Sequence, residues 1–353
     1  MNRKKWLAIV LAVAMIILSA ALEHCVFSPQ STLRVFSQYD CIHPALLKSF
    51  SEETGIQVEY TVVHRETVTD DVDLYAQCDL LLADTELLSL LKDQGFLFPL
   101  SEDIIDPGAD EHFQSVSFIQ LDGCACPALW TTMGLIYDPS TTEVRLTGWS
   151  DLFSGEFTGR VVMPQTSREA YAVALSALGH SVNTQDESEL ASALEYLQQQ
   201  RPQVLEYRST ADLEETFQLY PDAVACCYAS DAIALMSNIP GLSFVMASEG
   251  SWQMLLSYAV PAGAEDETLS QALIDHLTTP LAMAKNAAYS GMAPVSREAY
   301  DLLDHSWKAN PLAYPHGEDW EADPLLDSQP SSIQGERRVQ WLLLRQEWVS
   351  TYR

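Results

Sequence analysis

The stretch FSQYDCIHPALLKSF, residues 36–50, passes from a predicted strand to a predicted helix with almost no loop between them. The helix, residues 42–54, has Pro44 near its start, apolar residues at helical spacing and Gly55 as its stop signal. A strand rich in β-branched residues is predicted next, over residues 56–63. This order predicts a mostly parallel sheet with helices packed against it.

The same alternation continues downstream. Residues 78–83, CDLLLA, form a continuous apolar run typical of a buried strand, and a helix is predicted over residues 84–94, before Gly95. In sheets of this kind, ligands lie beyond the carboxyl ends of the strands. Asp40 and Asp84 fall at such ends, so both are candidate ligand-binding residues.

A second unit of the same kind begins near residue 148. Its predicted strands cover residues 160–163, 223–228 and 242–247, and its predicted helices cover residues 167–178 and 190–200. A strand over residues 255–260 then returns to the first unit, and a helix over residues 336–352 closes the chain. At 353 residues, about twice the length of an ordinary domain, the chain is predicted to form two α/β lobes with a cleft and a hinge between them.

The N-terminus carries the pattern of an export signal. Three bases among the first five residues precede an uncharged apolar run over residues 6–22. This run is slightly long for a cleaved signal and slightly short for a membrane span, so cleavage after Ala21, lipidation at Cys25 and retention as an anchor all stay open. Each of the three places the rest of the chain outside the cytoplasm, in the periplasm or on the outer face of the cytoplasmic membrane.

Acidic residues outnumber basic ones by 49 to 19, and the net charge is −30. Phosphate binding needs clustered Lys and Arg, so nucleic acid and anionic lipid surfaces are poor partners for this chain. The charge attracts cations, although an acidic surface that keeps the protein soluble and monomeric is the favoured explanation of it.

Six cysteines follow Cys25, an even number in an exported chain, so disulfides are allowed but not required. Two close pairs, Cys124 with Cys126 and Cys226 with Cys227, leave open a thiol-based metal-handling protein. No CxxC pair or zinc-type His spacing accompanies them, and free cysteines pack as small apolar residues, so we expect no metal and no other cofactor. The sequence also lacks the motifs of hydrolases, metalloproteases and nucleotide-binding enzymes, which argues against catalysis.

Five segments, taken in order, resemble the extracellular solute-binding proteins of ABC importers, most closely the spermidine/putrescine-binding type. They are LRVFSQYDCIHPALLKSFSEETGIQVEY (33–60), CDLLLADTELLSLLKDQGFLFPL (78–100), ALWTTMGLIYD (128–138), GWSDLFSGEFTGRVVMPQTSREAYAVALSALGHSVNT (148–184) and LLSYAVPAGAEDETLSQALIDHL (255–277). The resemblance implies a two-lobed, type II periplasmic-binding-protein-like fold. It also implies that a small cationic, polyamine-like solute is captured by hinge closure and delivered to a membrane permease. An anchored sensor that binds its solute in the same cleft is an alternative function.

The resemblance divides the chain into lobes. After an N-terminal segment, 1–25, lobe 1 is expected to comprise residues 32–136 and about 257–305, and lobe 2 residues 137–256 and about 306–353. Strands near residues 135–138 and 247–256 are expected to form the hinge between them.

The resemblance also implies a set of ligand contacts. The loop 38–41 would form one wall of the cleft through Tyr39 and Asp40, although relatives have aromatic residues at the ends of this loop. The other implied contacts are Asp84, Glu86, Glu169, Tyr228 and Trp252. Carboxylates would meet the ammonium groups of the ligand, and aromatic faces would cover its methylene chain.

Each of these residues also has a structural explanation. Asp84 and the pair of Thr166 and Glu169 suit helix caps, Tyr228 and Trp252 suit the core, and Tyr39 with Asp40 suits a solvated turn. Both explanations stay open from the sequence.

Several positions depart from the pattern of the resembling family. Thr166 and Leu256 stand where relatives have Asp, and Met254 stands where a Trp is usual. Asp84 and Glu86 add negative charge on the side of the first lobe. We therefore expect the recognition of ligand amines to have shifted toward lobe 1.

Overall fold

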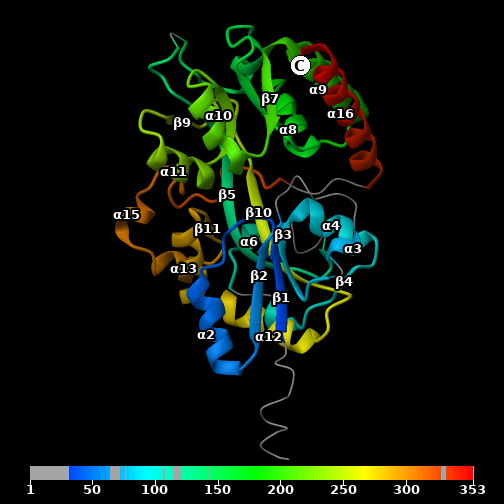
Figure 1. Cartoon of the computed structure of the whole chain (residues 1–353), viewed down its shortest axis with the longest axis vertical. Coiled ribbons are helices and arrows are strands. Elements are labelled where there is room, and N and C mark those ends of the chain that lie inside the picture. Colours follow the sequence, from blue (N-terminus) through cyan, green and yellow to red (C-terminus); the bar gives the residue numbers. More distant parts are fainter. Residues whose placement is uncertain are drawn as a thin grey trace, which may run out of the picture.

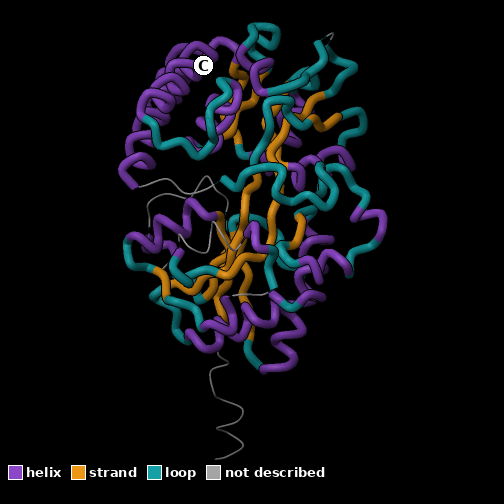
Figure 2. The backbone as a smooth tube through the Cα atoms, turned by 180° about the vertical axis from the view of Figure 1, so that it is seen from behind, coloured by secondary structure: helices purple, strands orange, loops and turns teal. Residues whose placement is uncertain are grey.

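The molecule has two lobes stacked along its long axis (Figure 1). Figure 2 shows strands running through the middle of both lobes, with helices on the outside. The computed structural model describes residues 32–63, 72–75, 77–105, 108–113, 121–142, 144–326 and 331–352. Within these ranges, no helix combines the length and the apolar character that a membrane crossing needs. The apolar run 6–22 and Cys25 lie outside the described residues.

The described strands form one mixed sheet in the order β2, β1, β3, β10, β5, β8, β6, β7, with β4 on β10 and with β9 and β11 on β5. Their bounds are β1 Thr32–Ser37, β2 Gln57–Val62, β3 Leu80–Asp84, β4 Leu97–Phe98, β5 Cys126–Tyr137, β6 Val161–Pro164, β7 Val204–Arg208, β8 Val224–Tyr228, β9 Ser243–Val245, β10 Gln253–Pro261 and β11 Ala293–Pro294. β1 is parallel to β2 and β3, and β6 is parallel to β7 and β8, as the alternation predicts. β5 and β10 are antiparallel to their neighbours because they carry the chain from one lobe to the other and back.

Helices cover the outer faces of both lobes. In Figure 1, α2 and α12 lie on the lower lobe, and α8, α9 and α16 lie on the upper lobe. The helices are α2 Pro44–Thr54, α3 Val72–Tyr75, α4 Thr85–Asp93, α5 Glu102–Ile105, α6 Glu111–Phe113, α8 Ser167–Ala177, α9 Glu187–Gln200, α10 Leu213–Leu219, α11 Ala229–Asn238, α12 Glu267–Thr278, α13 Pro280–Ser290, α14 Arg297–Asp301, α15 His305–Lys308 and α16 Ser331–Tyr352. Short 3₁₀ helices are η3 Trp149–Phe153, η4 Arg201–Gln203 and η5 Thr210–Asp212.

Local signals place the ends of these elements. Nδ1 of His43 accepts a hydrogen bond from the backbone N–H of Ala45 at the start of α2, and Gly55 ends the helix with a left-handed φ of 75°. The strands and helices predicted between residues 42 and 260 have ends within three residues of those observed. The last helix is longer than predicted: α16 begins at Ser331, whereas the predicted helix begins at residue 336.

Strand β5 belongs to both lobes. Its residues up to Thr132 pair with β10, and from Met133 onward they pair with β8 and β9. The chain crosses back before β10, where the N–H of Met133 donates to the carbonyl oxygen of Trp252 at 3.0 Å. The two crossings lie close to the predicted hinge strands, and the exact division of the chain between the lobes stays a prediction.

The C-terminal part of the chain contacts both lobes. Trp320 packs against Trp130 on the first half of β5, with ring centroids 5.7 Å apart. α16 instead packs on the upper lobe, where Nε1 of Trp341 donates to the carbonyl oxygen of Gln165 at 2.9 Å. Trp341 is buried, and together with Leu344 and Trp348 it forms the inner face of the helix.

Removing the Trp341 side chain should detach much of α16 from the upper lobe. We expect Trp341→Ala to lower the free energy of unfolding by about 3–5 kcal/mol, because it leaves a cavity and removes the shorter of two hydrogen bonds to the Gln165 carbonyl, which keeps only the 3.4 Å bond from Arg345. Urea denaturation measures this change. Val339→Ala on the exposed face of the same helix is the control and should change stability by less than about 0.5 kcal/mol. Equal effects of the two substitutions would contradict this packing.

Candidate functional site

Two small cavities, each of about 10 Å³, lie between elements of the two lobes. The first cavity is lined by Tyr39, Gln165, Thr166, Glu169, Ser209 and Thr210. The second cavity is lined by Asp84, Thr85, Glu86, Arg168, Tyr228, Met254, Leu255 and Leu326. A space of this size holds about one water molecule, so a larger solute requires the lobes to move apart.

The first cavity places one carboxylate against an aromatic ring. Thr166 caps α8, and its hydroxyl donates to Oε2 of Glu169 at 2.5 Å, which fixes the carboxylate at the cavity wall. Tyr39, at the end of β1, forms the opposite wall and donates its hydroxyl to Sδ of Met254 at 3.4 Å. Glu169 and Tyr39 are both buried, so an ammonium group held here would meet a carboxylate and a ring face in a desolvated site.

A second carboxylate, which the sequence analysis missed, lies behind this wall. Asp231, in the first turn of α11, is half-buried, and its Oδ2 atom is shielded from solvent without a hydrogen-bond partner among the described residues. Burial raises the pKa of Asp231 to about 6, a hydrogen bond with Thr210 opposes this shift, and the nearby carboxylates of Glu169 and Asp212 add to it. The only signal in the sequence is an acid three residues after Tyr228, and that pattern equally suits an ordinary helix start.

The second cavity holds both signs of charge. Asp84 caps α4 by accepting a hydrogen bond from the N–H of Leu87 at 2.9 Å, and it also lines the cavity. The helix-cap role and the ligand-contact role predicted for Asp84 are therefore compatible. Glu86 accepts a hydrogen bond from Arg337 of α16 at 2.5 Å, and this ion pair joins the two lobes. Arg168 is buried and donates to the carbonyl oxygen of Val182 at 2.8 Å.

The remaining predicted site residues have different surroundings. Tyr228 is fully buried at the end of β8 and lines the second cavity. Asp40 is exposed, lines neither cavity, and accepts a hydrogen bond from the Tyr289 hydroxyl at 2.9 Å. Trp252 is fully buried and stacks on Trp149 with ring centroids 5.0 Å apart, away from both cavity linings. Hinge packing therefore explains Trp252 better than ligand contact.

The two substituted positions on β10 lie next to predicted site residues. Met254 contacts the Tyr39 hydroxyl and lines the second cavity, so a sulfur atom occupies the position expected for a ring. Leu256 pairs with Asp84 on the neighbouring strand and is fully buried. The carboxylate absent at position 256 is thus present one strand away, on Asp84.

The structure gives no support to a thiol-based metal site. Within the part of the chain that the structure describes, no group of three His, Cys, Asp or Glu side chains could hold a metal ion. Its cysteines are buried and free, and Cys124, Cys226 and Cys227 lie in three different apolar clusters. Burial raises the pKa of the Cys227 thiol, which keeps it protonated and unsuited to metal binding.

Comparisons with known proteins agree with this architecture. The family model described as bacterial extracellular solute-binding protein matches residues 45–315. A spermidine/putrescine-binding periplasmic protein of Salmonella typhimurium is 25% identical over 335 residues, covering 91% of this chain and 94% of the relative. A putrescine/agmatine-binding protein of Pseudomonas aeruginosa is 23% identical, covering 96% of this chain and 98% of the relative. The solved structure of a spermidine/putrescine ABC transporter substrate-binding protein from Streptococcus pneumoniae superposes with a TM-score of 0.74 at 21% identity, covering 90% of this chain and 99% of that one.

The raised pKa of Asp231 predicts a pH-dependent cost in stability. Between about pH 4 and 6 the folded state holds this proton more tightly than the unfolded state, so stability falls as pH rises through that window. Asp231→Asn removes the cost, and it should raise the melting temperature at pH 7.5 by about 2–4 °C for each kcal/mol recovered, with little gain at pH 4. Thermal unfolding at the two pH values measures this difference. A variant that is less stable than the original protein at pH 7.5 would show that Asp231 has a structural role instead.

Proposed function

Because the chain belongs to the family of bacterial extracellular solute-binding proteins, we propose that it captures a small amine-bearing solute between its lobes and delivers it to an ABC permease. Members of this family are extracellular proteins, and this chain is exported as well. Its relatives that bind spermidine, putrescine or agmatine support an amine as the ligand class.

The carboxylates of the upper lobe are the observation that carries this proposal. Glu169 is buried at the wall of the first cavity, and Asp231 is half-buried with a shielded Oδ2 atom. Burial raises the pKa of Asp231, and the nearby Glu169 carboxylate adds to the shift. Placing two carboxylates together in a desolvated site costs stability, and a bound ammonium group offsets that cost through charge-assisted hydrogen bonds. Tyr39 adds a ring face for the cation or for its methylene chain.

This arrangement moves amine recognition to the upper lobe. From the sequence, Asp84 and Glu86 of lobe 1 are expected to take this role. In the structure Glu86 pairs with Arg337, and Asp84 caps α4. Glu169 lines the first cavity, and no Lys or Arg is among the residues that line it with Glu169. We therefore assign the ammonium site to Glu169 and Asp231, with Tyr39 opposite.

Capture requires the lobes to separate and close. The small volume of both cavities corresponds to closed lobes, and the strands that switch lobes near Thr132 and Trp252 are the connections about which they would bend. Closure on the solute excludes water from the carboxylates and presents both lobes together to the permease.

Replacing the Glu169 carboxylate tests the ammonium site. Glu169→Gln keeps an acceptor for the Thr166 hydroxyl and removes only the charge, so α8 should stay capped. We expect the binding of putrescine and of N-acetylputrescine, measured by calorimetry, to weaken by about 1.5–3 kcal/mol, the worth of a charge-assisted hydrogen bond.

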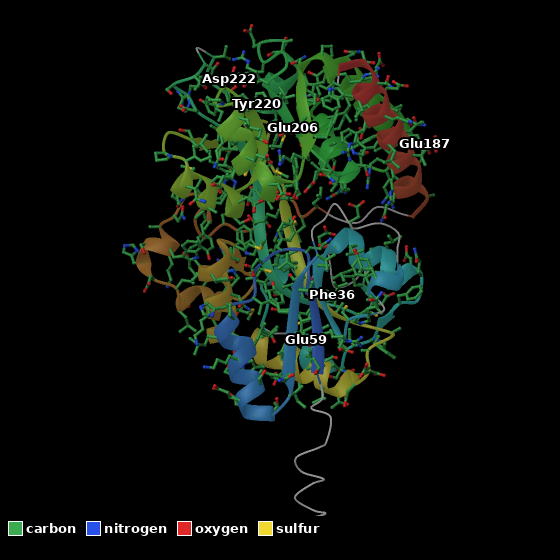
Figure 3. All side chains as sticks on the ribbon, viewed as in Figure 1. Phe36, Glu59, Glu187, Glu206, Tyr220 and Asp222 are labelled. Atoms are coloured by element: carbon green, nitrogen blue, oxygen red, sulfur yellow. The ribbon has the colours of Figure 1, made fainter. Side chains whose placement is uncertain are left out.

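Glu187→Gln is the matched control. Glu187 is exposed at the start of α9 on the outer side of the upper lobe (Figure 3), and its removal should change affinity by less than about 0.5 kcal/mol. Equal affinity in both variants would place the amine elsewhere. Failure of the unmodified protein to bind any amine would reject the proposed ligand class.

We also propose that the N-terminal segment holds the protein at the outer face of the membrane, with Cys25 as the lipidated residue. Expressed in a Gram-positive host, the full chain should fractionate with the membrane, and Cys25→Ser should release it into the medium. Retention of the Cys25→Ser variant in the membrane would identify the apolar run 6–22 as the anchor. Recovery of unmodified, fully soluble protein beginning at Leu22 would contradict anchoring altogether.

A further inference from the structure

The two cavities differ in their balance of charge. The first cavity has the Glu169 carboxylate in its wall and Asp231 behind it, and its lining contains no basic residue. The second cavity has Asp84 and Glu86 in its lining, but Arg168 lines it as well, and Arg337 is bound to Glu86. Among the described residues at the second cavity, two acids therefore face two guanidinium groups.

The Arg337 guanidinium already provides the cation that Glu86 would otherwise take from a ligand. It lies 2.5 Å from Oε1 of Glu86, and its side chain is only 2% exposed. α16 holds it there, because Trp341, one turn further along the helix, is fixed to the carbonyl oxygen of Gln165. Arg337 and Glu86 are far apart in the sequence, and no local motif predicts that they pair.

A second ammonium group at this end of the cleft would compete with two guanidinium groups that are already in place beside Asp84 and Glu86. To reach Glu86 it must displace Arg337, which would break a buried, charge-assisted ion pair. Beside Arg168, which is held by the carbonyl oxygen of Val182 and Oδ1 of Asn183, it would be repelled at low dielectric. An uncharged group avoids both costs. An acidic group avoids them too and is attracted by Arg168, but it is also repelled by Asp84 and Glu86.

We infer that the cleft selects a solute with one ammonium end and no positive charge at the other end, and that Arg337 excludes diamines by occupying the Glu86 carboxylate. This inference rests on the proposed function, because it assumes that Glu169 and Asp231 bind the ammonium end. Arg337 affects the choice of solute only through its ion pair with Glu86, so its role is that of a positioning residue.

Calorimetry on the full chain with four probes tests the selectivity. Putrescine and spermidine carry cations at both ends, N-acetylputrescine has a neutral end, and 4-aminobutyrate has an anionic end. We expect N-acetylputrescine or 4-aminobutyrate to bind at least about tenfold more tightly than putrescine and spermidine. Tighter binding of either polyamine than of both single-cation probes would overturn the inference while leaving the proposed function intact. Absence of binding by all four probes would reject the proposed function, and the inference with it.

Substitution of Arg337 tests its role directly. Arg337→Gln frees Glu86, and the affinity for putrescine should rise at least about tenfold relative to that for N-acetylputrescine. The double variant Glu86→Gln with Arg337→Gln removes both charges and should lose this gain. An unchanged affinity ratio in Arg337→Gln, or a gain that persists in the double variant, would overturn the assignment.

Arg201→Gln is the matched control. Arg201 also pairs with α16, through Oε2 of Glu347 at 2.5 Å, but it lines neither cavity. Its substitution should leave the affinity ratio unchanged, and a comparable shift would show that any loosening of α16 alters selectivity. The double variant and the four-probe comparison keep the inference testable if Arg337→Gln alone is too unstable to purify.

Discussion

Strand β5 hydrogen-bonds to β10 in one lobe and to β8 in the other, and the relative position of the lobes depends on these bonds. All its residues are buried, so breaking the ladder would leave unsatisfied backbone groups in the core. The proposed lobe motion would therefore need dihedral changes at the two crossings, near Thr132 on β5 and near Trp252 before β10. The cleft between the lobes takes its shape from this constraint.

The acids at the two cavities have structural roles that are compatible with the recognition role proposed for them. Asp84 ends β3, caps α4 and lines one cavity, while Glu169 is tied to the cap of α8 and lines the other. If the lobes open as proposed, a carboxylate that is fixed by its helix would keep its position, so little ordering would be needed on binding a cation. Capping and ligand binding are thus compatible at these positions, and the residue types suit both.

Signals confined to a few neighbouring residues predicted most of the fold. Pro44 and Gly55 bound a helix, the apolar run before Asp84 is a buried strand, and the resemblance to a known family supplied the two-lobed arrangement. The site was harder to predict because its chemistry depends on contacts distant in sequence. Nothing near Glu86 indicates Arg337, and nothing near Asp231 shows that its carboxylate is shielded beside Glu169. Trp252 had the right residue type for ligand contact, but packing against Trp149 buries it.

The order of the strands also has a consequence for how the chain acquires its structure after export. β3 completes its pairing only with β10, where Leu82 lies opposite Tyr258, whereas β5, β6, β8 and β9 of the other lobe are all made before residue 253. A chain that emerges from its N-terminus must leave the edge of β3 unpaired until the second lobe has crossed the membrane. Such long-range pairing is slow, and an open apolar edge pairs readily with other chains. Folding of the second-lobe strands made before residue 253 would shorten this interval, because it brings β10 back beside β3.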